Sequence, residues 1–145
     1  MIVLACGGRK FDDNALIYKS LDQLNLRPLV DLLIHGGADG ADRRSGAWAI
    51  VRSIPCLRIP APWSQKGRSA GILRNLRMRD FMGLKPDLLV AFPGGAGTAH
   101  MIKSAEAFGI PLWQPQQHAE LPSQLCDLLH IPRGISLPRR SNHQL

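Results

Sequence analysis

The chain has 145 residues, of which 45% are hydrophobic, and its 18 Lys and Arg residues outnumber its 11 Asp and Glu residues to give a formal net charge of +7. This length and composition fit one globular domain with a sizeable core, and no apolar run approaches the roughly 18 residues of a membrane span. The N-terminus has no basic leader, so we expect no secretory signal, a cytoplasmic protein and no membrane partner.

Short apolar runs alternate along the chain with segments of helical periodicity. The apolar runs predict five buried strands, at residues 2–6, 29–34, 56–60, 87–92 and 110–115. The intervening segments predict four helices, at residues 13–26, 40–53, 68–82 and 98–109. A further short helix is expected over residues 121–130, with Ser123 as its N-cap. Asp12 or Asp13 is expected to cap the first helix, and Gly109 to end the fourth.

Several side chains are expected to be buried. In the second helix these are Ala41, Trp48, Ile50 and Val51. The three cysteines are widely spaced, which argues against a disulfide framework and a zinc site. Cys6 and Cys56 lie in apolar runs and are expected to be buried as small hydrophobic residues. We expect no metal ion and no cofactor.

The order of these elements predicts the fold class. Continuous apolar strands are typical of a parallel sheet that is covered on both faces. Strand and helix alternate repeatedly, which predicts an α/β, Rossmann-like, doubly wound, mainly parallel sheet of about five strands with helices on both faces. We assign this domain to residues 1–114. Residues 115–145 are expected to form a C-terminal extension, with a short helix followed by a basic tail.

Ligands of open parallel sheets bind beyond the carboxyl ends of the strands, so the segments that follow each strand are the candidate site. Two of these segments are rich in glycine and open helices. A helix N-terminus presents unpaired backbone N–H groups, and glycine lets an anion approach them closely. We therefore expect a phosphate-bearing ligand to contact these two loops, at residues Gly36, Gly37, Ala38, Pro93, Gly94, Gly95, Gly97 and Thr98.

Charged and aromatic residues adjoin these loops. Arg9 directly follows the first strand and can pair with a phosphate, and the aromatic rings of Phe11 and Trp63 could stack on a base. Arg43 and Arg44 adjoin the second loop, and we expect only one of them, assigned to Arg43, to face the site. His35 is expected to be a satisfied core residue.

Three motifs together resemble the SLOG superfamily, which groups the cytokinin-activating LOG enzymes with the DNA-processing Smf proteins. They are GGRKF at residues 7–11, HGGADGAD at 35–42 and PGGAGT at 93–98, with Arg74 and Asn75 preceding the last motif. The first two resemble the YspA-like (cpYpsA-related) branch in particular, and the resemblance covers about residues 1–114. It implies a Rossmann-like sheet that binds a nucleotide-derived ligand, with Gly7, Gly8, Arg9, Phe11 and Asn75 among the contacts.

The same resemblance raises the question of catalysis. LOG enzymes cleave the N-glycosidic bond of a nucleoside monophosphate, and their motif glutamate falls here on Met101, next to His100. Methionine cannot stabilise a developing positive charge on the sugar as a carboxylate does. We therefore assign the catalytic roles to Asp42, in the first turn of the second helix, and to Arg74. N-glycosidic hydrolysis and ligand binding without turnover both stay open.

Other functions compete with the nucleotide-ligand hypothesis. Basic clusters at residues 66–79 and 133–140 fit a nucleic-acid-binding module like that of the Smf branch. A non-catalytic nucleotide sensor or sequestering protein is a further alternative. The resemblance also implies a homo-oligomer of two or four chains, for which the helix at residues 68–82 could supply the interface.

Overall fold

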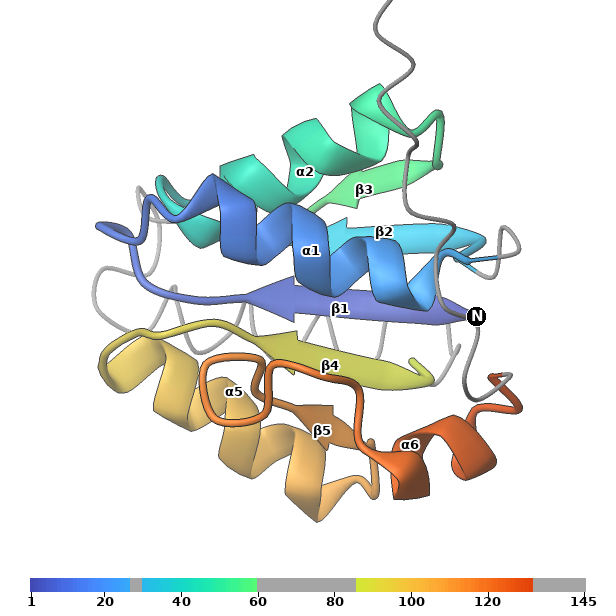
Figure 1. Ribbon diagram of the computed structural model, residues 1–145. Helices are drawn as coiled ribbons and strands as arrows, with labels where there is room; N and C mark the ends of the chain where they lie inside the picture. The colour runs from blue at the N-terminus through green and yellow to red at the C-terminus, as the bar shows by residue number, and fades with distance from the viewer. Residues whose placement is uncertain (27–29, 60–85, 132–145) are drawn as a thin grey trace, which may run out of the picture.

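The computed structural model describes residues 1–26, 30–59 and 86–131 (Figure 1). Five strands follow the predicted runs: β1 (Ile2–Cys6), β2 (Leu32–His35), β3 (Cys56–Arg58), β4 (Leu88–Ala91) and β5 (Leu112–Trp113). The described helices are α1 (Asn14–Leu24), α2 (Ala41–Val51), α5 (Ala96–Ala107) and α6 (Ser123–Leu128). None of these helices is long and apolar enough to cross a membrane. The helix expected at residues 68–82 lies outside the described residues.

The strands form one sheet in the order β3-β2-β1-β4-β5, and every neighbouring pair is parallel. Leu4 in the central strand β1 stands opposite Ile34 of β2 and Leu89 of β4. All five arrows in Figure 1 point the same way, so α1, α2 and α5 begin at the same edge of the sheet. The predicted α/β, Rossmann-like, parallel architecture is confirmed.

Helices cover both faces of the sheet. Alternate residues of each strand point to opposite sides, so each strand contributes side chains to both layers of the core. Val3 of β1 packs in a cluster with residues of α1 and α2, while Leu4 packs in a second cluster with residues of α5. Cys126 of α6 joins the first cluster. The C-terminal extension therefore packs on the main core as far as residue 131, and the domain boundary at residue 114 stays a prediction.

Helix termini follow local rules in three cases. The Asp13 side chain accepts a hydrogen bond from the Leu16 amide at 3.0 Å, which confirms it as the N-cap of α1. Gly109 follows α5 with φ of +67°, as expected for a residue that ends a helix. The assignment of Ser123 as an N-cap is wrong, because Pro122 occupies that position and Ser123 is the first residue of α6.

Three predictions of burial are also wrong. Ile50 and Val51 are 75% and 60% exposed, because α2 packs on the sheet through small residues on its other side. A Cβ on Gly46 would lie 2.6 Å from the His35 Nε2 atom, so that side of α2 approaches the sheet closely. Cys56 is exposed because β3 is an edge strand.

A polar contact fixes α1 against α2. Asp22 of α1 accepts hydrogen bonds from the Arg52 guanidinium and from the Trp48 indole, each at 2.8 Å. The hydrogen bond from Arg52 is the main reason that the pKa of Asp22 lies below its usual value. This contact fixes the C-terminal end of α2. It thereby helps to orient α2, whose N-terminal end adjoins the candidate site.

Candidate functional site

The winding of the chain reverses between β1 and β4. From β1 the chain passes through α1 and α2 on one face, whereas α5, which follows β4, packs on the other face. Ligands of doubly wound sheets bind at such a reversal, beyond the carboxyl ends of the strands. The segments there are the turn after β1, at residues 7–11, and the loop after β4, at residues 93–97 (Figure 1).

These two segments pack directly on each other. The Gly8 amide donates a hydrogen bond to the Pro93 carbonyl at 2.7 Å. A Cβ on Gly7 would lie 2.5 Å from the Ala41 Cβ, and one on Gly8 would lie 2.9 Å from the Pro93 oxygen. A Cβ on Gly94 would collide with the Thr98 hydroxyl and lie 2.7 Å from the Gly8 amide nitrogen. Glycine is required at these three positions by the packing of the protein itself.

Gly95 and Gly97 are different. A Cβ added to either one would meet nothing within 4 Å, and neither has a positive φ. Both are exposed, like the rest of residues 93–97. Within a helix, as at Gly97, glycine costs about 1 kcal/mol relative to alanine, whereas at an N-cap, as at Gly95, glycine is favoured over alanine. Among the described residues, no atom would block a side chain at either position, so the backbone there is open to close approach by a ligand.

The start of α5 also has unpaired hydrogen-bond donors. Gly95 is the N-cap of α5 and, having no side chain, cannot cap it. No described group accepts a hydrogen bond from the Gly95 or Ala96 amide. The positive end of the helix dipole lies at the same point. Thr98 is buried, with its hydroxyl against Gly94. We call residues 93–98 the α5 cradle.

The second glycine loop is organised differently from the α5 cradle. One carboxylate oxygen of Asp42 accepts hydrogen bonds from the Gly36 amide at 3.1 Å and the Ala38 amide at 3.3 Å. The His35 Nδ1 atom accepts from the Gly37 amide at 3.0 Å. The protein's own side chains therefore occupy the amides that we expected to be open to a ligand. Contact of this loop with a ligand through other atoms stays a prediction.

Two side chains stabilise this second loop from inside. Asp42 is only 3% exposed and His35 only 6%. Burial lowers the pKa of His35 below its usual value, and the charge of Arg58 lowers it further. A neutral imidazole can accept the Gly37 hydrogen bond through Nδ1, which agrees with that shift. His35 is thus a satisfied core residue, as predicted, and the catalytic role of Asp42 stays a prediction.

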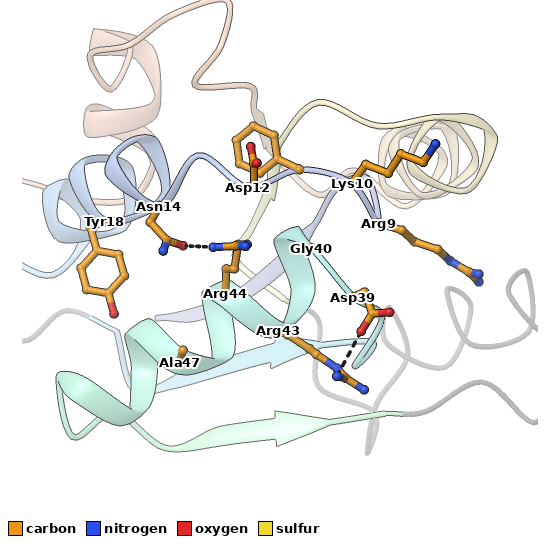
Figure 2. A pocket seen from close by; sticks show the side chains of 11 residues that line it. Arg9, Lys10, Asp12, Asn14, Tyr18, Asp39, Gly40, Arg43, Arg44 and Ala47 are labelled. Carbon is orange, nitrogen blue, oxygen red and sulfur yellow. Dashed lines mark hydrogen bonds and ion pairs between the residues drawn. The ribbon is translucent and has the colours of Figure 1, made fainter.

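A cavity of about 470 Å³ lies between the N-terminal halves of α1 and α2, on the opposite side of the turn after β1 from the α5 cradle (Figure 2). Arg9, Phe11 and Arg43, which the sequence assigned to the site, line it together with Lys10, Asp12, Asn14, Tyr18, Asp39, Gly40, Arg44 and Ala47. Both Arg43 and Arg44 line this cavity, and Arg43 also donates a hydrogen bond to the Gly37 carbonyl of the second loop at 3.4 Å. The assignment of Arg43 to the ligand stays a prediction. One face of Phe11 packs on Phe92, with ring centroids 5.5 Å apart.

Four of the lining residues, Lys10, Asn14, Tyr18 and Arg44, are not among those that the sequence predicted for the site. Helical spacing carried a signal for two of them, because Asn14 and Tyr18 are four residues apart and share one side of α1. Gly40 and Arg44 are spaced in the same way at the start of α2. What the sequence could not supply is that these two sides meet.

The remaining candidate residues divide into two groups. Arg74, Asn75 and Trp63 lie outside the described residues, as does the self-association surface assigned to residues 68–82. Met101, at the position of the LOG motif glutamate, is 1% exposed and packs in the core cluster on the α5 face. His100 is half-buried one turn into α5, with its Nε2 atom 3.5 Å from the Ser104 hydroxyl.

Comparison with known proteins agrees with this geometry. The sequence model of the YspA, cpYpsA-related SLOG family matches residues 1–65, which include the turn after β1 and the second glycine loop. The Gene 61 protein of Mycobacterium phage D29 is 33% identical in an alignment of 118 residues, which covers 76% of this chain and 92% of that protein. The chain therefore belongs to the YspA, cpYpsA-related SLOG family.

Proposed function

We propose that the protein binds a nucleotide or nucleotide-derived small molecule, with an anionic group of the ligand at the α5 cradle. The observation that carries the proposal is the exposed start of α5, where no described atom lies within 4 Å of a Cβ added to Gly95 and no described group accepts a hydrogen bond from the Gly95 or Ala96 amide. Membership of the SLOG family supports a nucleotide-related ligand.

The cradle suits a phosphate for electrostatic reasons. Unpaired amides at a helix N-terminus point toward the anion, and the helix dipole stabilises its negative charge. Because Gly95 has no side chain, phosphate oxygens can come within hydrogen-bond distance of the Gly95 and Ala96 amides. In doubly wound sheets, ligands bind at a reversal of winding such as that between β1 and β4.

Binding without turnover is the form of this function that the side chains favour. N-glycosidic cleavage needs a carboxylate near the sugar. The Asp42 carboxylate is buried and hydrogen-bonded within its own loop. At the position of the LOG motif glutamate, Met101 faces the core. Hydrolysis by Asp42 and Arg74 remains the alternative that a product assay tests.

A thermal-shift screen with mononucleotides, cyclic nucleotides, ADP-ribose and NAD tests the proposal, because a ligand of the folded state raises the melting temperature. For the ligands without a phosphate monoester, namely cyclic nucleotides, ADP-ribose and NAD, Gly95→Val should abolish the shift and leave the fold intact, since no described atom lies within 4 Å of a Cβ at that position. Ala107→Val, at the exposed C-terminal end of the same helix, is the matched control and should bind like the wild type. Equal affinity in wild type and Gly95→Val would refute the cradle assignment.

Each ligand found is then incubated with the protein and analysed for free base. Intact ligand after prolonged incubation supports a sensor or sequestering protein. Base release that disappears in Asp42→Asn, with ligand affinity retained, would support the hydrolase alternative instead.

The distribution of charge favours a second candidate function, nucleic-acid binding. Ten of the 18 basic residues and only one of the 11 acidic residues lie at residues 27–29, 60–85 and 132–145. The described residues carry the other eight basic and ten acidic residues, so the excess of positive charge belongs to those three segments. Binding to a nucleic-acid strand would weaken steeply with salt, whereas binding of a mononucleotide would weaken much less.

A further inference from the structure

We propose that the cavity between the N-terminal halves of α1 and α2 is a second ligand site, which binds a phosphate monoester of a small molecule with Arg44 as the principal anion receptor. The turn after β1 separates this cavity from the α5 cradle. On the cradle side, the Gly8 amide donates to the Pro93 carbonyl. On the cavity side, a Cβ on Gly40 would collide with the Gly8 carbonyl and lie 2.5 Å from that of Arg9. The two sites therefore have a common wall but different donors.

Arg44 is positioned without being neutralised. One guanidinium nitrogen donates to the Asn14 side-chain oxygen at 2.8 Å, and that partner carries no charge (Figure 2). Two nearby arginines are paired with carboxylates: Arg43 of α2 with Asp39 at 3.0 Å, and Arg52, the C-cap of α2, with Asp22 at 2.8 Å. Among the described carboxylates, none lies within 4.0 Å of Arg44. A guanidinium has five N–H donors, so most of those of Arg44 remain for a ligand.

The charge of the lining selects the class of anion. The cavity lining contains four cationic residues, Arg9, Lys10, Arg43 and Arg44, and two acidic residues, Asp12 and Asp39. A lining that is richer in positive than in negative charge favours a phosphate monoester, which carries close to two negative charges above its second pKa of about 6. A planar guanidinium also binds phosphate through two parallel hydrogen bonds. A monocarboxylate carries only one negative charge and should therefore be bound less tightly.

The size and the aromatic lining indicate an organic ligand larger than free phosphate. A volume of about 470 Å³ is in the range of small-molecule sites, which run from about 300 to 1,000 Å³. Phe11 and Tyr18 contribute ring surface to the lining. The Phe11 ring is held against Phe92 and is therefore a fixed surface. Such rings can pack against an apolar or aromatic part of the ligand.

Asn14 permits a sharp test. Asn14→Asp keeps the shape of the side chain and places a carboxylate beside Arg44, so it neutralises the receptor without removing it. The new ion pair, together with an acidic residue in the first turn of α1, should keep or raise the melting temperature. Arg44→Gln removes the receptor itself. Lys19→Gln is the control, because it removes one positive charge from an exposed part of α1 that does not line the cavity.

The probe is phenyl phosphate, titrated at pH 7.5 and followed through the Arg44 side-chain N–H resonance and the amides of α1 and α2. We expect saturable binding of phenyl phosphate to the wild type, tighter than the binding of benzoate. Arg44→Gln and Asn14→Asp should each weaken it at least tenfold, whereas Lys19→Gln should leave it unchanged. Gly95→Val should leave it unchanged, which separates this site from the α5 cradle. Each of four results would overturn the proposal. They are an affinity of Asn14→Asp for phenyl phosphate equal to that of the wild type, a weakening in Lys19→Gln as large as in Arg44→Gln, loss of binding in Gly95→Val, and no saturable shift in the wild type.

Discussion

Replacing Asp42 by alanine should destabilise the protein strongly, because its carboxylate stabilises the second glycine loop from inside. It accepts hydrogen bonds from the Gly36 and Ala38 amides at 3.1 and 3.3 Å and is 3% exposed. A hydrogen bond to a charged group contributes about 1.5–3 kcal/mol, and a buried amide left without a partner costs a similar amount. Since both bonds are long and end on one oxygen, we expect a loss of about 2–4 kcal/mol in the free energy of unfolding.

Urea unfolding followed by circular dichroism measures this loss, and thermal unfolding should show a fall of about 5–15 °C in melting temperature. Asp42→Asn retains an acceptor oxygen and should lose less than half as much. A purely catalytic carboxylate would behave differently, since its removal commonly leaves stability unchanged or raises it. An unfolding free energy of Asp42→Ala within about 0.5 kcal/mol of the wild type would refute the structural role.

Three further predictions follow from individual contacts. Gly94→Ala should lower the free energy of unfolding by about 1–3 kcal/mol, because the added Cβ collides with Thr98. Gly95→Ala is the control and should stay within about 1 kcal/mol of the wild type. Equal losses of both variants in urea unfolding would contradict this prediction. Because burial lowers the pKa of His35 from 6.5, the unfolded chain binds a proton more readily than the folded protein does. The free energy of unfolding should therefore fall as the pH drops through about 6.5 toward the lower pKa of the folded state. His35→Asn should remove this part of the pH dependence of the melting temperature. Ser45→Ala should be neutral or stabilise the fold by about 1 kcal/mol, because no described group forms a hydrogen bond with this buried hydroxyl; a clear loss in thermal unfolding would reveal a partner.

The order and type of the elements could be read from the sequence because the strands are buried on both faces. Runs such as Leu88–Ala91 have no polar residue to interrupt them, and the glycine-rich segments mark where each run ends. What the sequence does not contain is the position of each strand in the sheet. Cys56 was therefore assigned to the interior, although β3 is at the edge and exposes it.

Helix α2 shows why hydrophobicity alone can assign the wrong side of a helix. Its buried side includes Ser45 and Gly46, which are small enough for the close approach to His35. Ile50 and Val51 are more apolar but lie on the exposed side. Where two backbones pack closely, residue volume decides burial more strongly than polarity does.

The candidate site was only partly readable for a similar reason. Both glycine loops have the composition of an anion site, and the sequence cannot distinguish them. Their amides are distinguished by tertiary contacts: Asp42 and His35 fold back onto the second loop, whereas nothing described covers Gly95. Arg44 was passed over because its importance depends on Asn14, which is 30 residues away in the chain.

The central claim is that the α5 cradle, and not the second glycine loop, presents open amides to an anionic ligand. Titration of the ¹⁵N-labelled protein with AMP, followed through backbone amide resonances, tests it most directly. We predict saturable downfield shifts at Gly95 and Ala96, with Gly36 and Gly37 nearly unmoved because their amides are already bonded. Shifts confined to Gly36 and Gly37, with Gly95 and Ala96 unmoved at saturation, would contradict the account.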